Sequence, residues 1–369
     1  MLHPENNPDY KGLQVNSGVG SQPCVNPYRR PRAKRPALTA SDYVEGIRKG
    51  DVSILGQAVT LVESTIEAHR ALAQEVIEKC LPYSGNSKRI GITGVPGAGK
   101  STSIDVFGLH VIRNGGKLAV LAIDPSSERS QGSILGDKTR MEKLSVNPDA
   151  FIRPSPSAGS LGGVARKTRE TIVLCEAAGF DNIFVETVGV GQSETAVHSM
   201  VDFFLLIQLA GTGDELQGIK RGIMEMADGI AINKADGDNI ERAQLAAAQF
   251  RNALHLFPPT PSKWVPEVVT YSGYYELNID KVWDMIDRYF EYVNKTGYFE
   301  RKRNEQAKYW MLETINEQLR NDFYNRPEIR VLLEQKEQRV LNNEQSSFTA
   351  AHDVLEAYYS TLSKDSQRS

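Results

Sequence analysis

A glycine-rich segment that carries one lysine and one serine has the composition of a phosphate-binding loop. It reads GVPGAGKS, fits the pattern G-x-x-x-x-G-K-[ST], and lies between an apolar run at residues 90–93 and a helical pattern from Thr102. Glycines let backbone N–H groups turn toward phosphate oxygens, the lysine reaches the terminal phosphates, and the serine hydroxyl is offered to Mg²⁺. The predicted nucleotide-binding residues of this P-loop are Gly94, Val95, Pro96, Gly97, Ala98, Gly99, Lys100, Ser101 and Thr102, with Lys100 also predicted to be catalytic.

The tetrapeptide Asn233-Lys234-Ala235-Asp236 follows another apolar run and favours guanine over adenine. An aspartate carboxylate can accept hydrogen bonds from both N1–H and the 2-amino group of guanine, and adenine does not offer this pair of donors. Asn233, Lys234 and Asp236 are therefore predicted to read the base, and the predicted ligands are GTP and GDP. Ser272 and Gly273 follow the last apolar run, where a backbone N–H can reach the guanine O6. The alternative for these two residues is an ordinary turn at the end of a strand.

Three acidic residues are candidates for a metal site. Mg²⁺ bound to a triphosphate takes oxygen ligands, or waters that carboxylates hold. Asp124 and Glu186 each end a predicted strand, Asp137 lies on a polar loop, and Glu186 begins an E-x-x-G sequence with the spacing of the D-x-x-G switch of GTPases. The predicted metal residues are Ser101, Asp124, Asp137 and Glu186, and Asp137 and Glu186 are also predicted to be catalytic. Taken alone, each carboxylate is more often a helix cap or a solvated charge.

The residues after Glu186 predict slow intrinsic hydrolysis. Small GTPases place a water-positioning glutamine directly after D-x-x-G, whereas here Val190 has that place and Gln192 lies two residues later. A polar, glycine-bearing loop at residues 211–220 follows a further apolar run. Because loops at the carboxyl ends of strands line the ligand crevice of α/β proteins, this loop is either a plain connection or a mobile reporter of nucleotide state.

Short apolar runs alternate with longer amphipathic ones over residues 83–296, and this alternation predicts a parallel sheet that positions the site. Strands are predicted at residues 89–93, 118–123, 151–153, 182–186, 203–209, 229–233 and 267–270. The predicted fold class is α/β: a P-loop NTPase with a mainly parallel sheet flanked by helices, plus N-terminal and C-terminal helical extensions. The extensions are residues 39–82, with Asp51 as a helix N-cap, and residues 297–369, while the basic, proline-rich residues 1–38 are predicted to be a disordered tail.

Composition excludes several classes of partner. In 369 residues, 43 Lys and Arg against 46 Asp and Glu leave a net charge of -3, so no overall field draws the chain to nucleic acid or an anionic membrane. The most apolar stretch, residues 200–211, is interrupted by an aspartate and a glutamine and is far shorter than the ~20 residues that span a bilayer. Cys24, Cys80 and Cys175 contain no C-x-x-C pair, which argues against a disulfide framework and favours a cytoplasmic location.

Taken together, the motifs resemble one known family. The chain is similar to the MeaB/ArgK family, the methylmalonyl-CoA mutase-associated GTPases, some of which are also described as LAO/AO transport system ATPases or kinases. The resemblance runs from about residue 40 to the C-terminus and is most specific over residues 94–236. It rests on these motifs, in this order: GVPGAGKST, AIDPSS, GSILGDKTRM, RPSPSAGSLGGVA, ETVGVGQSE, AGTGDELQGIKRGI and NKAD.

The resemblance implies a Mg²⁺-dependent GTPase that forms a homodimer with a helical C-terminal extension. It further implies a chaperone of an adenosylcobalamin-dependent acyl-CoA mutase, of the methylmalonyl-CoA mutase type, that gates cofactor loading and protects or reactivates the mutase. Residues 214–220 resemble the family's additional switch, and Lys220 in it is predicted to act in catalysis when the mutase is bound.

Functions of other classes are the alternatives. An ATPase or kinase that phosphorylates a periplasmic amino-acid-binding protein of a transport system would need an acceptor site, and the sequence has no recognisable one. A nickel-inserting GTPase would need a His/Cys cluster near the switches, whereas the six histidines are scattered. A non-enzymatic scaffold would not need a P-loop, acidic switches and N-K-x-D together in one chain.

Overall fold

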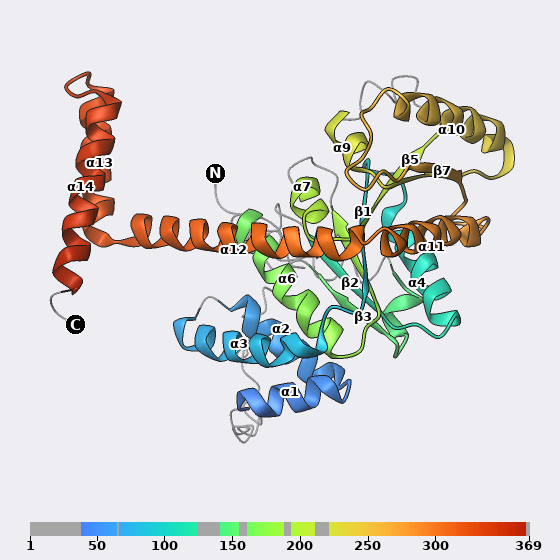
Figure 1. Ribbon diagram of the computed structural model, residues 1–369, viewed down its shortest axis with the longest axis horizontal. Helices are drawn as coiled ribbons and strands as arrows, with labels where there is room; N and C mark the ends of the chain where they lie inside the picture. The colour runs from blue at the N-terminus through green and yellow to red at the C-terminus, as the bar shows by residue number, and fades with distance from the viewer. Residues whose placement is uncertain are drawn as a thin grey trace, which may run out of the picture. The chain divides into compact units, whose positions relative to one another are not determined.

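The protein is described by a computed structural model for residues 38–64, 66–123, 141–154, 161–187, 193–210 and 221–366. Residues 1–37 of the tail predicted at residues 1–38 lie outside these ranges. The elements below belong to the unit that begins at Thr39. Seven strands, each parallel to its neighbours, form a sheet in the order β3-β2-β4-β1-β5-β6-β7 (Figure 1). The predicted α/β class with a parallel sheet is confirmed.

The strands have the bounds that the apolar runs predict, to within one residue at each end. They are β1 Lys88–Gly94, β2 Leu118–Ile123, β3 Ala150–Arg153, β4 Asn182–Thr187, β5 Phe203–Leu209, β6 Gly229–Asn233 and β7 Glu267–Thr270. Strands of a parallel sheet are covered on both faces, so they need continuous apolar runs rather than alternation. All five residues of β6 are buried, as this requires.

Helices pack on both faces of the sheet. In β4, Ile183 and Val185 belong to a core shared with the N-terminal helices and α6, whereas Phe184 between them belongs to a core shared with α4 and α11. The helices of the described ranges are α1 Ala40–Arg48, α2 Val52–Glu63, α3 Glu67–Cys80, α4 Lys100–Arg113, α6 Leu161–Ala177, α7 Ser193–His198, α9 Arg221–Met226, α10 Ile240–Leu254, α11 Ile279–Lys295, α12 Tyr298–Asn325, α13 Pro327–Leu341 and α14 Ser347–Ser366. None of them is both long enough and apolar enough to cross a membrane.

The predicted N-terminal helical segment is present, and its boundaries follow from side-chain caps. Asp51 accepts hydrogen bonds from the backbone N–H groups of Ser53 (2.8 Å) and Ile54 (3.1 Å) at the start of α2, which confirms the predicted N-cap. Thr39 and Asp42 form a reciprocal capping box at the start of α1. The buried positions of α2 then pack into the same core as α6.

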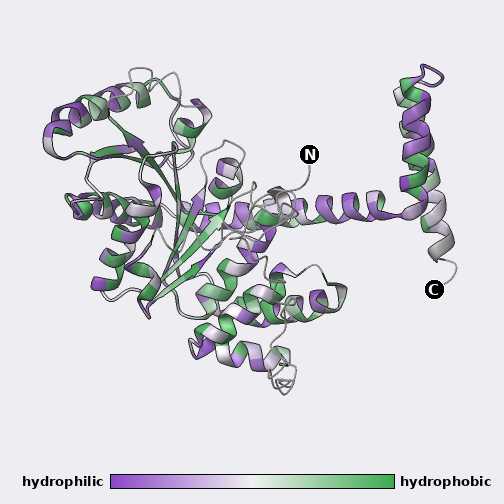
Figure 2. Ribbon diagram, turned by 180° about the vertical axis from the view of Figure 1, so that it is seen from behind, coloured by the Kyte–Doolittle hydropathy of each residue, from purple (hydrophilic) through white to green (hydrophobic). Residues whose placement is uncertain are grey.

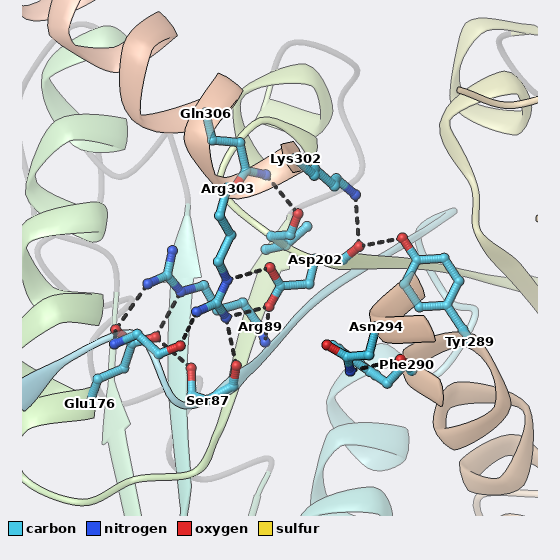
Figure 3. A network of polar contacts seen from close by, with 12 residues as sticks. Ser87, Arg89, Glu176, Asp202, Tyr289, Phe290, Asn294, Lys302, Arg303 and Gln306 are labelled. Carbon is cyan, nitrogen blue, oxygen red and sulfur yellow. Dashed lines mark hydrogen bonds and ion pairs between the residues drawn. The ribbon is translucent and has the colours of Figure 1, made fainter. Parts of the chain in front are cut away.

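Helix α12 is fastened to the sheet by a buried network of charged groups (Figure 3). Arg303 donates two hydrogen bonds to the carboxylate of Asp202, at 2.9 and 2.7 Å, and the same carboxylate accepts from the backbone N–H of Arg89 (2.9 Å). Arg89 in turn pairs with Glu176 of α6 at 2.8 and 2.9 Å. Through Asp202, Arg303 thus connects α12 to the start of β1 and β5. Separating α12 from the sheet would leave the buried Asp202 carboxylate without this cation, which is costly.

Further along α12, two side chains bind the main chain just before β5. Gln306 donates to the carbonyl of Val201 (2.9 Å), and the indole of Trp310 donates to that of Ser199 (2.9 Å), while Arg169 stacks on the Trp310 ring. In the sequence, Trp310 belongs with Leu312, Ile315 and Leu319 to the helical apolar positions that predict a dimer contact, whereas the structure places its indole against the chain's own domain. The Trp310 side chain lies on the side of α12 that faces α6 of the same chain, and this contact buries part of the ring.

Beyond the sheet, α12 leads to α13 and α14, which pack together around Ile329, Val354 and Tyr358 (Figure 1). The prediction of a helical C-terminal extension is thereby confirmed. Figure 2 shows hydrophobic residues along the strands of the sheet and hydrophilic residues over much of these last helices.

Candidate functional site

The carboxyl ends of four strands bring the predicted site residues to one edge of the sheet. β1 leads into the P-loop, its neighbour β4 contains Glu186 near its end, β6 ends at Asn233, and β7 leads to Ser272. Ile92 of β1 is paired with Glu186 of β4 in the register of the two strands. Glu186 therefore lies beside the end of β1, where the P-loop begins. This edge of a parallel sheet is where α/β proteins bind ligands.

Two glycines of the P-loop have a backbone conformation that disfavours other residues. Gly97 and Gly99 have φ angles of 81° and 85°, in the left-handed region that disfavours other residues. A side chain on Gly99 would also collide with Asn233, because its Cβ would lie 2.6 Å from Asn233 Nδ2. The glycines of the motif therefore shape the loop, and Gly99 leaves room for the Asn233 side chain.

Lys100 and Ser101 lie in the first turn of α4. Backbone N–H groups at this end of a helix point along its axis and can bind an anion. The Lys100 ammonium donates to the carbonyl of Gly94 (2.8 Å), so it lies over the loop. The Ser101 hydroxyl donates to Glu186 Oε1 at 3.3 Å. The structure thus brings together a hydroxyl and a carboxylate, the kind of oxygen donors that Mg²⁺ accepts beside the phosphates of a nucleotide.

The remaining predicted acidic ligands and switches lie outside the described residues. This applies to Asp124 and Asp137, to Val190 and Gln192, and to the loop at residues 211–220 with Lys220. Within the described ranges, no group of three or more His, Cys, Asp or Glu side chains is arranged to hold a metal ion by itself. A Mg²⁺ site here would be completed by phosphate oxygens and water, as is usual for this ion.

Asn233 joins the segment that is predicted to read the base to the P-loop. Its side-chain nitrogen donates to the carbonyl of Ala98 (2.8 Å), and its side-chain oxygen accepts from the backbone N–H groups of Lys234 (2.7 Å) and Gly273 (3.0 Å). Lys234 has a left-handed φ of 59°, which turns the chain sharply at the end of β6. One buried amide therefore fixes three loops of the site relative to one another.

Asp236 and Ser272, two residues of the predicted base site, lie in direct contact. The Ser272 hydroxyl donates to Asp236 Oδ2 at 2.5 Å, and the backbone of Ser272 exchanges two hydrogen bonds of 3.0 Å with Leu277. Asp236 remains partly exposed, so a ligand can reach its carboxylate. The structure places N-K-x-D and Ser272-Gly273 side by side, with Asp236 positioned by its neighbour.

Sequence reasoning missed one contact at the centre of this site. The hydroxyls of Ser103 in α4 and Tyr271 after β7 lie 2.6 Å apart, although 168 residues separate them in the chain. Neither residue belongs to a motif that predicts this contact, and nothing in the local pattern of α4 sets Ser103 apart from an ordinary buried serine.

Comparisons with known proteins agree with this geometry. The family model for methylmalonyl Co-A mutase-associated GTPase MeaB matches residues 55–328. The chain is 43% identical to the GTPase ArgK of Escherichia coli over 318 residues, which are 86% of this chain and 96% of that protein. It is 44% identical to the mitochondrial methylmalonic aciduria type A homolog of Mus musculus over 325 residues, 85% of this chain and 78% of that protein. A crystal structure of an LAO/AO transport system kinase matches with a TM-score of 0.70 and 37% identity, over 87% of this chain and 97% of that chain.

Proposed function

The chain belongs to the family of methylmalonyl Co-A mutase-associated GTPases and is a guanine-nucleotide-binding P-loop GTPase, and from that premise we propose that it is the chaperone of an adenosylcobalamin-dependent acyl-CoA mutase. The client is of the methylmalonyl-CoA mutase type, and the GTP cycle gates loading of its cofactor and protects or reactivates it. The observation that carries this proposal is the family match, which spans the whole nucleotide site and reaches from α2 to the start of α13.

Each group of residues in the site has its own proposed role in GTP hydrolysis. The first N–H groups of α4 and the Lys100 ammonium bind phosphate oxygens, and Lys100 opposes the charge that develops on the transferred phosphoryl group. Ser101 and Glu186 would hold Mg²⁺, together with Asp124 and Asp137 as further proposed ligands. When bound, Mg²⁺ would neutralise negative charge between the terminal phosphates. Asp236 fixes the base, and the loop around Asn233 keeps base and phosphate sites in register.

The client is proposed to act through the segments that flank this site. Glu186 begins the E-x-x-G switch at residues 186–189, and three residues separate this switch from the start of α7 at Ser193. The loop of residues 214–220 is proposed to be the additional switch, in which Lys220 meets phosphate or an opposing carboxylate only when the mutase is bound. Lys220→Ala is accordingly expected to lose most of the stimulation of GTP turnover by the mutase.

Binding of the mutase tests the proposal at equilibrium. Linkage requires that a client which changes nucleotide affinity is itself bound differently in the GTP and GDP states. We expect sedimentation of the chain with a methylmalonyl-CoA mutase to give affinities that differ about 5-fold or more between GDP and a non-hydrolysable GTP analogue. Absence of a complex in both nucleotide states would contradict the proposal.

A homodimer is the second part of the proposal, and α12 offers the surface for it. Leu312, Ile315 and Leu319 expose 48%, 46% and 59% of their surface, and their spacing of three and four residues is that of a helix–helix seam. The helix is 28 residues long, and this stretch lies C-terminal to the positions that bind the sheet domain. A second copy of the same helix is the partner that such a repeating apolar seam fits.

Truncation after Trp310 is expected to convert the dimer to a monomer of intact fold. The cut keeps Arg303 and Trp310, so the buried pair with Asp202 is retained and only the exposed seam and the last two helices are lost. Light scattering measures the mass, and GTP turnover checks that the truncated chain is folded. Ile315→Ser should weaken the dimer in the full chain, whereas Leu245→Ser, at an exposed leucine of α10, serves as the control. An unchanged dimer mass after truncation would contradict the seam.

The kinase alternative is not favoured over the mutase chaperone, because the family model names the mutase association. The LAO/AO kinase designation belongs to a related crystal structure and gives no acceptor residue in this chain. Transfer of radiolabelled γ-phosphate from nucleotide to an amino-acid-binding protein would support the alternative. The cytoplasmic location stays a prediction, with which the free, buried thiols of Cys80 and Cys175 agree.

A further inference from the structure

A chain of two hydroxyls connects strand β7 to the P-loop. The Tyr271 hydroxyl lies 2.6 Å from Ser103 Oγ, and Ser103 Oγ donates to the carbonyl of Gly99 at 2.8 Å. Tyr271 and Ser103 are fully buried, and the Tyr271 ring packs on Phe107 at 5.3 Å between centroids. Water is therefore excluded from this contact, and the Tyr271 hydroxyl depends on Ser103 for its hydrogen bond.

The direction of these hydrogen bonds follows from the number of protons. A serine hydroxyl has one proton, and a carbonyl oxygen can only accept, so the Ser103 proton lies toward Gly99. The Tyr271 hydroxyl must then be the donor to Ser103. Burial raises the pKa of Tyr271, so the phenol is protonated and can donate at neutral pH.

The Gly99 carbonyl is one of two at the end of the P-loop that are bound from behind. Asn233 donates to the carbonyl of Ala98 at 2.8 Å, and Ser103 donates to that of Gly99 through both its backbone N–H (2.9 Å) and its hydroxyl. In a trans peptide the N–H points opposite to the carbonyl. Holding these two carbonyls thus aims the N–H groups of Gly99 and Lys100 at the side where phosphate binds.

We propose that Tyr271 and Ser103 are positioning residues for nucleotide binding: through their hydroxyls, the residue that follows strand β7 holds the Gly99–Lys100 peptide in the orientation that binds the β-phosphate. Tyr271 directly precedes Ser272 and Gly273 of the base-reading loop, and its backbone is bound on both sides, to Ile232 and Ala235 at 2.9 Å each. Base recognition and phosphate binding are therefore coupled through one side chain. The proposal concerns nucleotide binding alone and does not depend on the mutase.

Tyr271→Phe tests it, because the change removes one hydroxyl and keeps the ring against Phe107. GDP and GMP share the base and the first phosphate, so the ratio of their affinities reports on the β-phosphate contacts. We expect calorimetry to show a GDP-to-GMP affinity ratio that falls about tenfold, the effect of losing one buried hydrogen bond. The matched control is Tyr289→Phe, which removes an equally buried hydroxyl that donates to the Asp202 carbonyl (2.8 Å), and it should leave the ratio unchanged.

Ser103→Ala and the double variant separate positioning from folding. Ser103→Ala leaves the Tyr271 phenol buried without an acceptor and should lower the melting temperature, whereas Ser103→Ala/Tyr271→Phe removes both partners and should recover most of it. The affinity ratio should stay low in both variants. A normal ratio in Tyr271→Phe, equal weakening of GDP and GMP, or a ratio that recovers together with stability would each overturn the proposal. The double variant also keeps the test decisive where a single variant fails to fold.

Discussion

Asp236→Asn is expected to weaken GDP binding about 10⁴-fold and to transfer the preference of the protein to xanthine nucleotides. The Asp236 carboxylate, positioned by the Ser272 hydroxyl at 2.5 Å, presents two acceptors to N1–H and the 2-amino group of guanine. An asparagine presents one acceptor and one donor, which is the pattern that complements N1–H and the 2-oxo group of xanthine. The same reasoning predicts strong discrimination of the wild-type protein against ATP.

Calorimetric titration of GDP, XDP and ADP into wild type and variant measures both effects. Asp238→Asn is the matched control, since Asp238 is an exposed aspartate two residues further along the chain. It removes the same charge close to the site and should leave the order of affinities unchanged. Equal affinity of the wild-type protein for ADP and GDP would contradict the assignment of the base site.

Lys100→Ala is expected to reduce GTP hydrolysis about 10³-fold or more, because it removes the cation that faces the transferred phosphoryl group. Lys100 opens α4 and lies over the P-loop, within 2.8 Å of the Gly94 carbonyl. Glu186→Ala and Asp137→Ala should retain measurable nucleotide binding and lose Mg²⁺-dependent turnover, since these changes remove metal or switch contacts and leave the P-loop in place.

Single-turnover hydrolysis and equilibrium binding, measured side by side, distinguish these outcomes. Lys281→Ala, which removes an exposed lysine of α11 far from the P-loop in sequence, is the control for loss of charge. Full turnover in Glu186→Ala would remove Glu186 from the site even though its carboxylate lies 3.3 Å from the Ser101 hydroxyl.

The sheet was predictable because its strands are covered on both faces. Buried parallel strands must be continuous apolar runs, and β2, β5, β6 and β7 have the bounds that these runs predict. The P-loop and N-K-x-D were predictable for a different reason: their chemistry is carried by residues close together in the chain. The meeting of Ser101 with Glu186 then follows from β1 and β4 being neighbours in the sheet.

Contacts that depend on distant side chains were not predictable. Asp202 is a polar interruption of an apolar run in the sequence, and only the structure shows that Arg303, 101 residues later, compensates its buried charge. Helical spacing groups Trp310 with Leu312, Ile315 and Leu319, and only the structure shows that Trp310 contacts the chain's own domain while the other three are exposed. Asp124, Asp137 and Lys220 stay predictions, since they lie outside the described residues.

The proposed chaperone function is best tested by the rate of GTP hydrolysis, measured with and without a methylmalonyl-CoA mutase. Val190 stands where small GTPases place a water-positioning glutamine, so we expect slow basal turnover that the client must accelerate. We expect the rate of GTP turnover to rise in proportion to the amount of complex formed, and Lys220→Ala to lose most of this rise. A basal rate that no adenosylcobalamin-dependent acyl-CoA mutase alters, at concentrations that saturate the protein, would contradict the proposed function.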